Sequence, residues 1–314
     1  MVNSRTPLLY RLTAGLVRRL RYVRGQVKRI RRQLSIYRAS RVIVTPFTGF
    51  ILSDHYLSSE IDEHALNWLN RRARSFRGGR AKYDKCRFVF CQVDQLQEFA
   101  DIYLPEIESK FVLLTGKWGL PGLELSATVH EILNHPHLVY WFSQNQVFRE
   151  LSIAPFPYGV EVRAAPAVVR EARRARKKSV HSRSKILFIP HSSIHPHLEG
   201  ASRRFRESMS GVMKPKMSHG EYLSEIARHL MVLSPGGDRP DTYRHWECIA
   251  LGSVPVSNLE AELSPLFLNN MRYTRSVSEA LRLESPTELA SDLLWRFDTW
   301  KKTVKSAREK SRMK

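Results

Sequence analysis

Apolar residues recur every three or four positions along the first 40 residues of the chain, which predicts one long amphipathic helix. The polar faces of this helix are rich in arginine, and Thr6-Pro7 is a suitable start for it. We therefore expect a separate basic helix over residues 1–40, ahead of the globular part of the chain. Its apolar stripe consists of Leu9, Leu12, Leu16, Leu20, Val23, Val27, Ile30, Leu34 and Tyr37.

From residue 41 onward, short runs of β-branched and aromatic residues alternate with stretches of helical periodicity. Strands separated by helices are typical of parallel sheets, because a parallel strand pair needs a long crossover. The predicted fold class is therefore α/β, with two Rossmann-like parallel-sheet domains after the basic helix. Strands are expected at 41–45, 88–92, 111–115, 138–142, 185–189, 229–233 and 253–256, and helices at 61–74 and 94–104.

The length of 314 residues also favours two domains, since a single core rarely grows beyond about 250 residues. We place the first α/β domain at 41–160 and the second at 185–290. The alanine- and arginine-rich stretch between them, 161–184, is expected to be a basic linker or an exposed helix. A basic C-terminal helix is expected at 291–314.

The net charge of +21 is distributed unevenly along the chain. Residues 1–40 carry eleven Lys or Arg and no Asp or Glu, and residues 161–185 and 296–314 are also strongly basic. Together these three segments carry +24, so the remaining residues carry about −3. A near-neutral body with basic appendages argues against a protein whose whole surface is built to coat nucleic acid.

The basic helix can lie on an anionic membrane surface, where each nearby Lys or Arg contributes about 1 kcal/mol. Its stripe also has a period near 3.5 residues, so a coiled-coil seam or packing onto the body is the alternative. Arginines interrupt any signal-peptide core, and no stretch approaches the roughly 20 apolar residues that span a bilayer.

Three cysteines without metal spacing indicate reduced thiols. We expect a cytoplasmic protein that can attach peripherally to a membrane.

The most specific chemical pattern lies in residues 231–256, which predict a strand, a glycine-bearing loop, a helix and a second strand. Gly236 and Gly237 allow the backbone to approach a ligand closely, and amides at a helix N-terminus can hold an anion such as pyrophosphate. Asp241 or Thr242 can cap the helix, and Gly252 can end it.

Arg244 and Glu247 are three residues apart and share one face of this helix. A guanidinium can hold phosphate oxygens, while a carboxylate can accept hydrogen bonds from a ribose diol. The pair therefore favours a nucleotide sugar as the ligand.

The same segment resembles the nucleotide-sugar domain of the exostosin-like glycosyltransferases, whose pattern is a Pro-Gly-Asp loop, a following Arg and a Gly-x-x-Pro-Val ending. The Trp246-Glu247 step is similar to the related xylosyltransferase branch. A looser likeness extends over 134–145 and 153–160. The matching positions of the loop segment are Pro235, Gly237, Asp238, Arg244, Gly252, Pro255 and Val256.

The resemblance implies the two-domain fold called GT-B, with a nucleotide-sugar donor on the second domain and a glycan or lipid-linked acceptor approaching from the first. It implies a hexosyl- or pentosyltransferase of polysaccharide biosynthesis, with a UDP-sugar as the expected donor. Because the chain lacks an Asp-x-Asp motif, we expect no metal and no cofactor, with Arg244, the loop amides and Arg239 stabilising the leaving diphosphate. The expected donor-binding residues are Ser234, Gly236, Gly237, Asp238, Arg239, Thr242, Arg244 and Glu247.

Two further residue pairs are candidates for the rest of the site. Asp54 and His55 follow an apolar run at the start of the first domain and can supply a catalytic base beside Arg244, although a surface turn explains them equally well. Gln144 and Asn145 end a predicted strand and are expected at the hinge or cleft.

Two functions other than glycosyl transfer remain open, and two clusters of basic and histidine residues also need an interpretation. A basic nucleic-acid-binding protein explains the charge but not the glycine loop or the Arg244–Glu247 pair, and an inactive sugar-binding scaffold is the third possibility. Arg203, Arg204 and Arg206 can reach phosphate or form a solvated helix face. The spacing of His191, His195, His197 and Glu199 matches no standard ligand motif, so no metal site is expected there.

Overall fold

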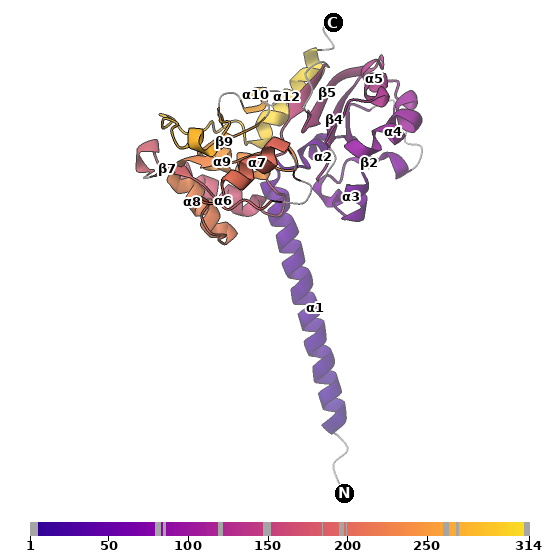
Figure 1. Ribbon diagram of the computed structural model, residues 1–314. Helices are drawn as coiled ribbons and strands as arrows, with labels where there is room; N and C mark the ends of the chain where they lie inside the picture. The colour runs from indigo at the N-terminus through magenta and orange to yellow at the C-terminus, as the bar shows by residue number, and fades with distance from the viewer. Residues whose placement is uncertain are drawn as a thin grey trace.

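In the computed structural model the chain forms a body of two parallel sheets, with one long helix, α1 (Thr6–Ala39), standing off it (Figure 1). The predicted α/β class, with two Rossmann-like sheets after an N-terminal helix, is confirmed. The structure describes residues 6–78, 83, 86–118, 122–146, 152–183, 185–194, 198, 200–259, 264–267 and 270–310.

The first sheet has six parallel strands in the order β2-β1-β3-β4-β5-β6. Successive residues of a strand point to opposite faces, so Phe90 and Leu114 enter one apolar cluster while Val89 and Leu113 enter the other. Both faces are therefore covered, as is usual for parallel sheets. The strands are β1 (His55–Leu57), β2 (Arg74–Ser75), β3 (Phe88–Gln92), β4 (Phe111–Gly116), β5 (Leu138–Gln144) and β6 (Ile153–Phe156).

Helices α2 (Thr48–Leu52) and α12 (Phe297–Lys310) pack against the first sheet. The C-terminal helix α12 returns to pack on β4 and β5, with Trp300 and Val304 buried. The C-terminal basic segment thus contains a covering helix of the first domain, with Lys302 and Lys305 exposed and Arg308 over the ring of Phe88. The other helical elements of this domain are α3 (Ser59–Glu63), η1 (Asn67–Leu69), η2 (Phe76–Gly78), η4 (Val93–Gln95), α4 (Leu96–Glu98), η5 (Phe99–Tyr103), η6 (Leu104–Glu106) and α5 (Ala127–Leu133).

The second sheet has four parallel strands in the order β10-β9-β8-β7. The predicted helix after the glycine loop is confirmed as α9 (Tyr243–Leu251), with Thr242 at its N-cap and Gly252 ending it at a φ of 84°. The strands are β7 (Lys185–Phe188), β8 (His229–Leu233), β9 (Val254–Ser257) and β10 (Arg272–Tyr273). The helices are α6 (Ala165–Ala175), η7 (Val180–Ser182), α7 (Gly200–Ser208), α8 (His219–Arg228), α10 (Ser264–Phe267) and α11 (Val277–Ala280).

Two predicted elements at the start of the first domain are wrong. The segment 41–45 is not a sheet strand, because its backbone hydrogen bonds go to segments outside the two sheets. The Val44 amide donates to the carbonyl of Trp295, and the Val44 carbonyl accepts from the amide of Val160. The predicted helix 61–74 stops after Glu63, since Ala65 adopts a left-handed conformation with a φ of 48°.

The basic stretch 161–184 was expected to be a linker or exposed helix, and it is instead part of the second domain. Its helix α6 contacts α8 and α9 and buries residues such as Val168 and Ala172. Two of its following arginines bind the end of α9: Arg176 donates to the carbonyl of Ala250 at 2.8 Å, and Arg183 donates to that of Leu251 at 2.6 Å. Cations are favourable there because the last carbonyls of a helix lack partners within it.

A buried carboxylate, that of Asp241, joins the two domains at the start of α9. Its side chain accepts from the backbone amide of Tyr158 at 2.9 Å and from Nε1 of Trp246 at 2.8 Å. Its own amide donates to Oδ1 of Asn145 at 2.8 Å. Because Tyr158 and Asn145 belong to the first domain, this one residue sets the position of α9 relative to the first sheet.

No helix in the described part of the chain is both long and apolar enough to cross a membrane. All three cysteines, Cys86, Cys91 and Cys248, are buried free thiols.

Replacing Asp241 with Ala should lower the free energy of unfolding by about 3 kcal/mol, because the change leaves buried donors of Tyr158 and Trp246 without an acceptor. The measurement is urea denaturation followed by fluorescence. The control is Asp298→Ala, at an exposed position of α12. Equal stability of the two variants would show that the Asp241 contacts do not hold the domains.

Candidate functional site

A cavity of about 530 Å³ opens where the strands β7 and β8 of the second sheet end. Its floor is formed by α8 and α9, and the carboxyl edge of a parallel sheet is where open α/β folds bind ligands. Three of the residues predicted from the sequence, Thr242, Arg244 and Glu247, line it. The complete lining is Pro190, His191, Arg206, Lys216, Met217, His219, Tyr222, Pro235, Thr242, Tyr243, Arg244 and Glu247.

Glu247 and Arg244 are held in place by a shared tyrosine. The hydroxyl of Tyr222 donates to Oε2 of Glu247 at 2.9 Å and accepts from Nε of Arg244 at 3.3 Å. The Arg244 guanidinium also donates to Oγ of Ser192 at 2.6 Å and to the carbonyl of His191 at 2.8 Å. Glu247 is only 7% exposed, so it can be reached only from the cavity.

Cations crowd this cavity around a single carboxylate. Burial lowers the pKa of Arg206 to about 10, and the charge of the nearby Arg244 is the second cause. Lys216 and His219 line the same cavity. The hydrogen bond between His219 and Glu247, at 3.3 Å, raises the pKa of His219. A bound polyanion would relieve the repulsion among these cations.

The glycine loop does not offer the free amides that the sequence suggested. The amide of Gly236 donates to Oδ1 of Asn258 at 2.9 Å, and that of Gly237 donates to the carbonyl of Arg239 at 2.8 Å. The loop is in turn fixed by Arg206, which donates to the Gly236 carbonyl. In this arrangement the groups available to an anion are side-chain cations, not these two amides.

Two hydroxyl groups near the loop have no hydrogen-bond partner among the described residues. Oγ of Ser234 and Oγ1 of Thr242 are buried and make no hydrogen bond among the described residues. Of these two residues, Thr242 lines the cavity, although its hydroxyl oxygen is buried in this arrangement.

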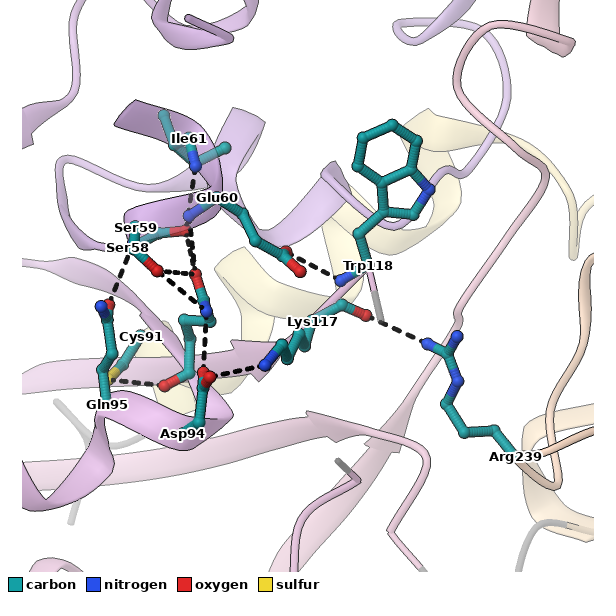
Figure 2. Close-up of polar contacts among 11 residues, drawn as sticks. Ser58, Ser59, Glu60, Ile61, Cys91, Asp94, Gln95, Lys117, Trp118 and Arg239 are labelled. Carbon is teal, nitrogen blue, oxygen red and sulfur yellow. Dashed lines mark hydrogen bonds and ion pairs between the residues drawn. The ribbon is translucent and has the colours of Figure 1, made fainter. Parts of the chain in front are cut away.

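The remaining loop residues face the first domain. Arg239 lies over the ring of Tyr158 at 4.5 Å and donates to the carbonyl of Lys117 at 3.3 Å (Figure 2). Asp238 is exposed and lies 3.8 Å from Nε of Arg239. Both residues therefore stand at the junction of the domains and outside the cavity lining.

A polar cluster at the carboxyl edge of the first sheet lies beside this junction (Figure 2). Oε1 of Gln92, at the end of β3, accepts from the hydroxyl of Ser58 at 2.7 Å, and its amide donates to Asp94 at 2.7 Å. Asp94 pairs with Lys117 at 2.5 Å, and Oε2 of Glu60 accepts from the Trp118 amide at 2.9 Å. Two carboxylates of the first domain thus lie near the peptide that Arg239 contacts.

Asp54 and His55 lie at the opposite, amino-terminal edge of the first sheet, because they precede or begin β1. Asp54 accepts from the amide of Phe88, and buried His55 has Nδ1 at 3.4 Å from Sγ of Cys86. Burial lowers the pKa of His55. Neither Asp54 nor His55 lines the cavity, so the structure gives no support for either as the catalytic base.

Gln144 and Asn145 lie at the carboxyl end of β5. Nε2 of Gln144 donates to the carbonyls of Pro46 and Pro157, at 3.1 and 3.0 Å. Asn145 adopts a φ of 53° and accepts from the Asp241 amide. Asn145 thus lies at the interdomain contact, where the sequence predicted a hinge or cleft, whereas these hydrogen bonds of Gln144 stay within the first domain.

Among the described residues, no three His, Cys, Asp or Glu side chains form a group that could hold a metal ion. Of the histidine-bearing loop, His195, His197 and Glu199 lie outside the described residues. The carbonyl of His191 binds Arg244.

Sequence reasoning missed several residues of the cavity. His219 and Tyr222 are three apart on α8, a spacing that also fits an ordinary amphipathic helix. Arg206 was weighed against a solvated helix face, and only the fold shows it bound to the loop. Outside the cavity, Gln92 at the end of β3 and Lys117 just after β4 carried a usable signal, since polar residues after parallel strands meet at one edge.

Replacing Glu247 with Gln should lower the pKa of His219, because it removes the carboxylate that raises it. The folded-state pKa of His219 lies above its unfolded value of about 6.5, so the pair stabilises the fold fully below that pH and loses this effect as pH rises through the folded value. NMR titration of the imidazole measures the shift. Glu225→Gln, elsewhere on α8, is the control, and an unchanged His219 titration in Glu247→Gln would contradict the assignment.

Comparison with known protein families finds no family model that matches the chain, and comparison with curated proteins finds no match.

Proposed function

We propose that the protein is a glycosyltransferase that moves a sugar from a nucleotide diphosphate sugar, with UDP as the expected nucleotide, to a glycan or glycoconjugate acceptor. The observation that carries this proposal is the cavity at the carboxyl edge of the second sheet, in which Arg244 and Glu247 lie on one helix face and contact the same tyrosine. The cation-rich lining suits a diphosphate, and the recessed carboxylate suits a diol. The resemblance of the loop segment to the exostosin-like enzymes supports the same reaction class.

In this proposal the diphosphate is bound by side chains. Arg244, Arg206 and Lys216 supply fixed positive charge where the leaving group gains negative charge. Thr242 lines the cavity beside them. Helix α9 also directs the positive end of its dipole toward this region, since its N-terminal residues Thr242, Tyr243 and Arg244 line the cavity.

Glu247 retains capacity to bind a ribose. A carboxylate has about four acceptor positions, and the described contacts of Glu247 are one with Tyr222 and one with His219. Two positions are then open to the hydroxyls of a nucleotide. His219, which stays protonated to higher pH because of Glu247, adds a donor or charge at the same place.

The acceptor side is assigned to the carboxyl edge of the first sheet. An inverting transfer needs a base that takes the proton of the attacking hydroxyl. Asp94 and Glu60 are the carboxylates that the described structure places in the polar cluster beside the domain junction. Between the two, Asp94 is the more accessible choice, since its side chain is 38% exposed.

UDP should raise the melting temperature of the wild-type protein in a thermal-shift screen against UDP, GDP, CMP and ADP, each with and without magnesium. In Glu247→Ala the affinity for UDP should fall about tenfold or more, since hydrogen bonds to a charged group are lost. In Arg244→Ala turnover should fall about a hundredfold, and more than donor affinity does.

The matched control for these variants is Arg203→Ala, on α7, whose guanidinium pairs with Glu207 and is not among the residues that line the cavity. It should bind UDP as the wild type does. Absence of a shift with every nucleotide, in a folded wild-type protein, would remove the nucleotide-sugar proposal.

Asp94→Asn should reduce transfer to acceptor about a hundredfold while leaving UDP binding unchanged, if Asp94 takes the acceptor proton. Asp54→Asn, at the other edge of the sheet, is the matched carboxylate control. Steady-state assays with radiolabelled donor measure both. Equal activity of Asp94→Asn and the wild type would assign the base elsewhere.

A further inference from the structure

The apolar stripe of α1 is exposed from Val23 to Leu34, within the part of the helix whose side chains the structure describes. Val23, Val27, Ile30 and Leu34 are 42–54% exposed, which is far above the exposure of a packed stripe. Only the end of the helix, at Ile36 and Ala39, enters the core of the body. Figure 1 shows the same arrangement, with the helix extending away from the body over most of its 34 residues, a length of about 50 Å.

A hollow of about 860 Å³ lies at the foot of this helix and continues the stripe onto the body. One wall is made by Ile30 and Leu34 of the stripe itself. The other wall includes Trp68, which is half-buried, and the exposed pair Arg71 and Arg72. A surface that receives the stripe therefore also meets these three residues of the first domain.

The charges around this surface select the kind of partner. Residues 1–40 carry eleven Lys or Arg and no acid, and Arg41, Arg71 and Arg72 add three cations at the hollow. Asp54 is the single carboxylate among the described residues that line the hollow. Two copies of the helix paired side by side would bring two such sets of cations together, whereas an anionic surface neutralises them.

We propose that α1 and the hollow at its foot form one docking surface for an anionic lipid bilayer. The helix lies along the interface with its stripe in the headgroup region, and Lys28 and the arginines lie among the lipid phosphates. Trp68 sits at the interface, where indole rings are favoured, and Arg71 and Arg72 bind phosphate. The body is thus held at two points, and its orientation on the membrane is fixed. This inference does not depend on the proposed transfer reaction.

Co-sedimentation with vesicles tests the docking surface, using the full chain with phosphatidylcholine vesicles and with vesicles containing about 30% phosphatidylserine. The wild type should bind only the anionic vesicles. Val27→Glu with Ile30→Glu, both at exposed positions, should abolish binding by placing carboxylates in the stripe. Arg71→Glu with Arg72→Glu should weaken it by about tenfold or more, and Trp68→Ala should weaken it in the same direction.

The matched control is Lys302→Glu with Lys305→Glu, which makes the same change in net charge on exposed positions of α12, at the far side of the body from α1 (Figure 1). It should bind nearly as the wild type does. Circular dichroism and melting curves confirm that each variant is folded.

Three results would overturn the proposal. The first is equal binding by the Arg71–Arg72 variant and the α12 control, since charge alone would then explain the attachment. The second is a wild-type dimer, measured by light scattering, that the stripe variant dissociates, because the stripe would then be a seam between copies. The third is tighter binding to single-stranded RNA than to anionic vesicles with no dependence on the stripe, which would indicate a nucleic-acid arm.

Discussion

The arrangement of the molecule depends on the buried carboxylate of Asp241. It accepts from the Tyr158 backbone of the first domain and from Trp246 of the second, and its amide is bound by Asn145. A buried carboxylate without donors would be costly, so these contacts must form together. Since Asp241 immediately precedes α9, the same constraint that joins the domains also fixes the helix that carries Arg244 and Glu247. The relative position of the domains and the geometry of the cavity therefore depend on the same contacts of Asp241.

The parts of the fold that the sequence predicted are those with strong local signals. Helix α9 begins after Thr242 at the N-cap position and ends at Gly252 in a left-handed conformation, and the sequence predicted both positions. The segment 41–45 has a strand-like composition, yet its hydrogen bonds go to Trp295 and Val160, which are far away in the chain. For the site, Arg244 and Glu247 were found because one helix positions both. The contributions of Arg206 and His219 arise from other helices and need the tertiary structure.

Charge composition was a poor guide to location in the middle of the chain. Arg176 and Arg183 belong to a segment that looks like a solvated basic appendage, but their guanidiniums bind the final carbonyls of α9. Burial lowers the pKa of each to about 10, and both still fulfil the role of a helix cap. A count of basic residues along the sequence therefore overstates how many of them in this segment are free to bind a partner.

The proximity of Arg206 and Arg244 has a consequence for any measurement on this protein. Two guanidiniums in one cavity attract whichever anion the solvent provides, and phosphate, sulfate and citrate all offer several oxygens. A true ligand of the cavity must displace such an ion. The apparent affinity of that ligand therefore depends on the identity of the buffer anion as well as on ionic strength. A dilute buffer with chloride as its anion competes least for the cavity.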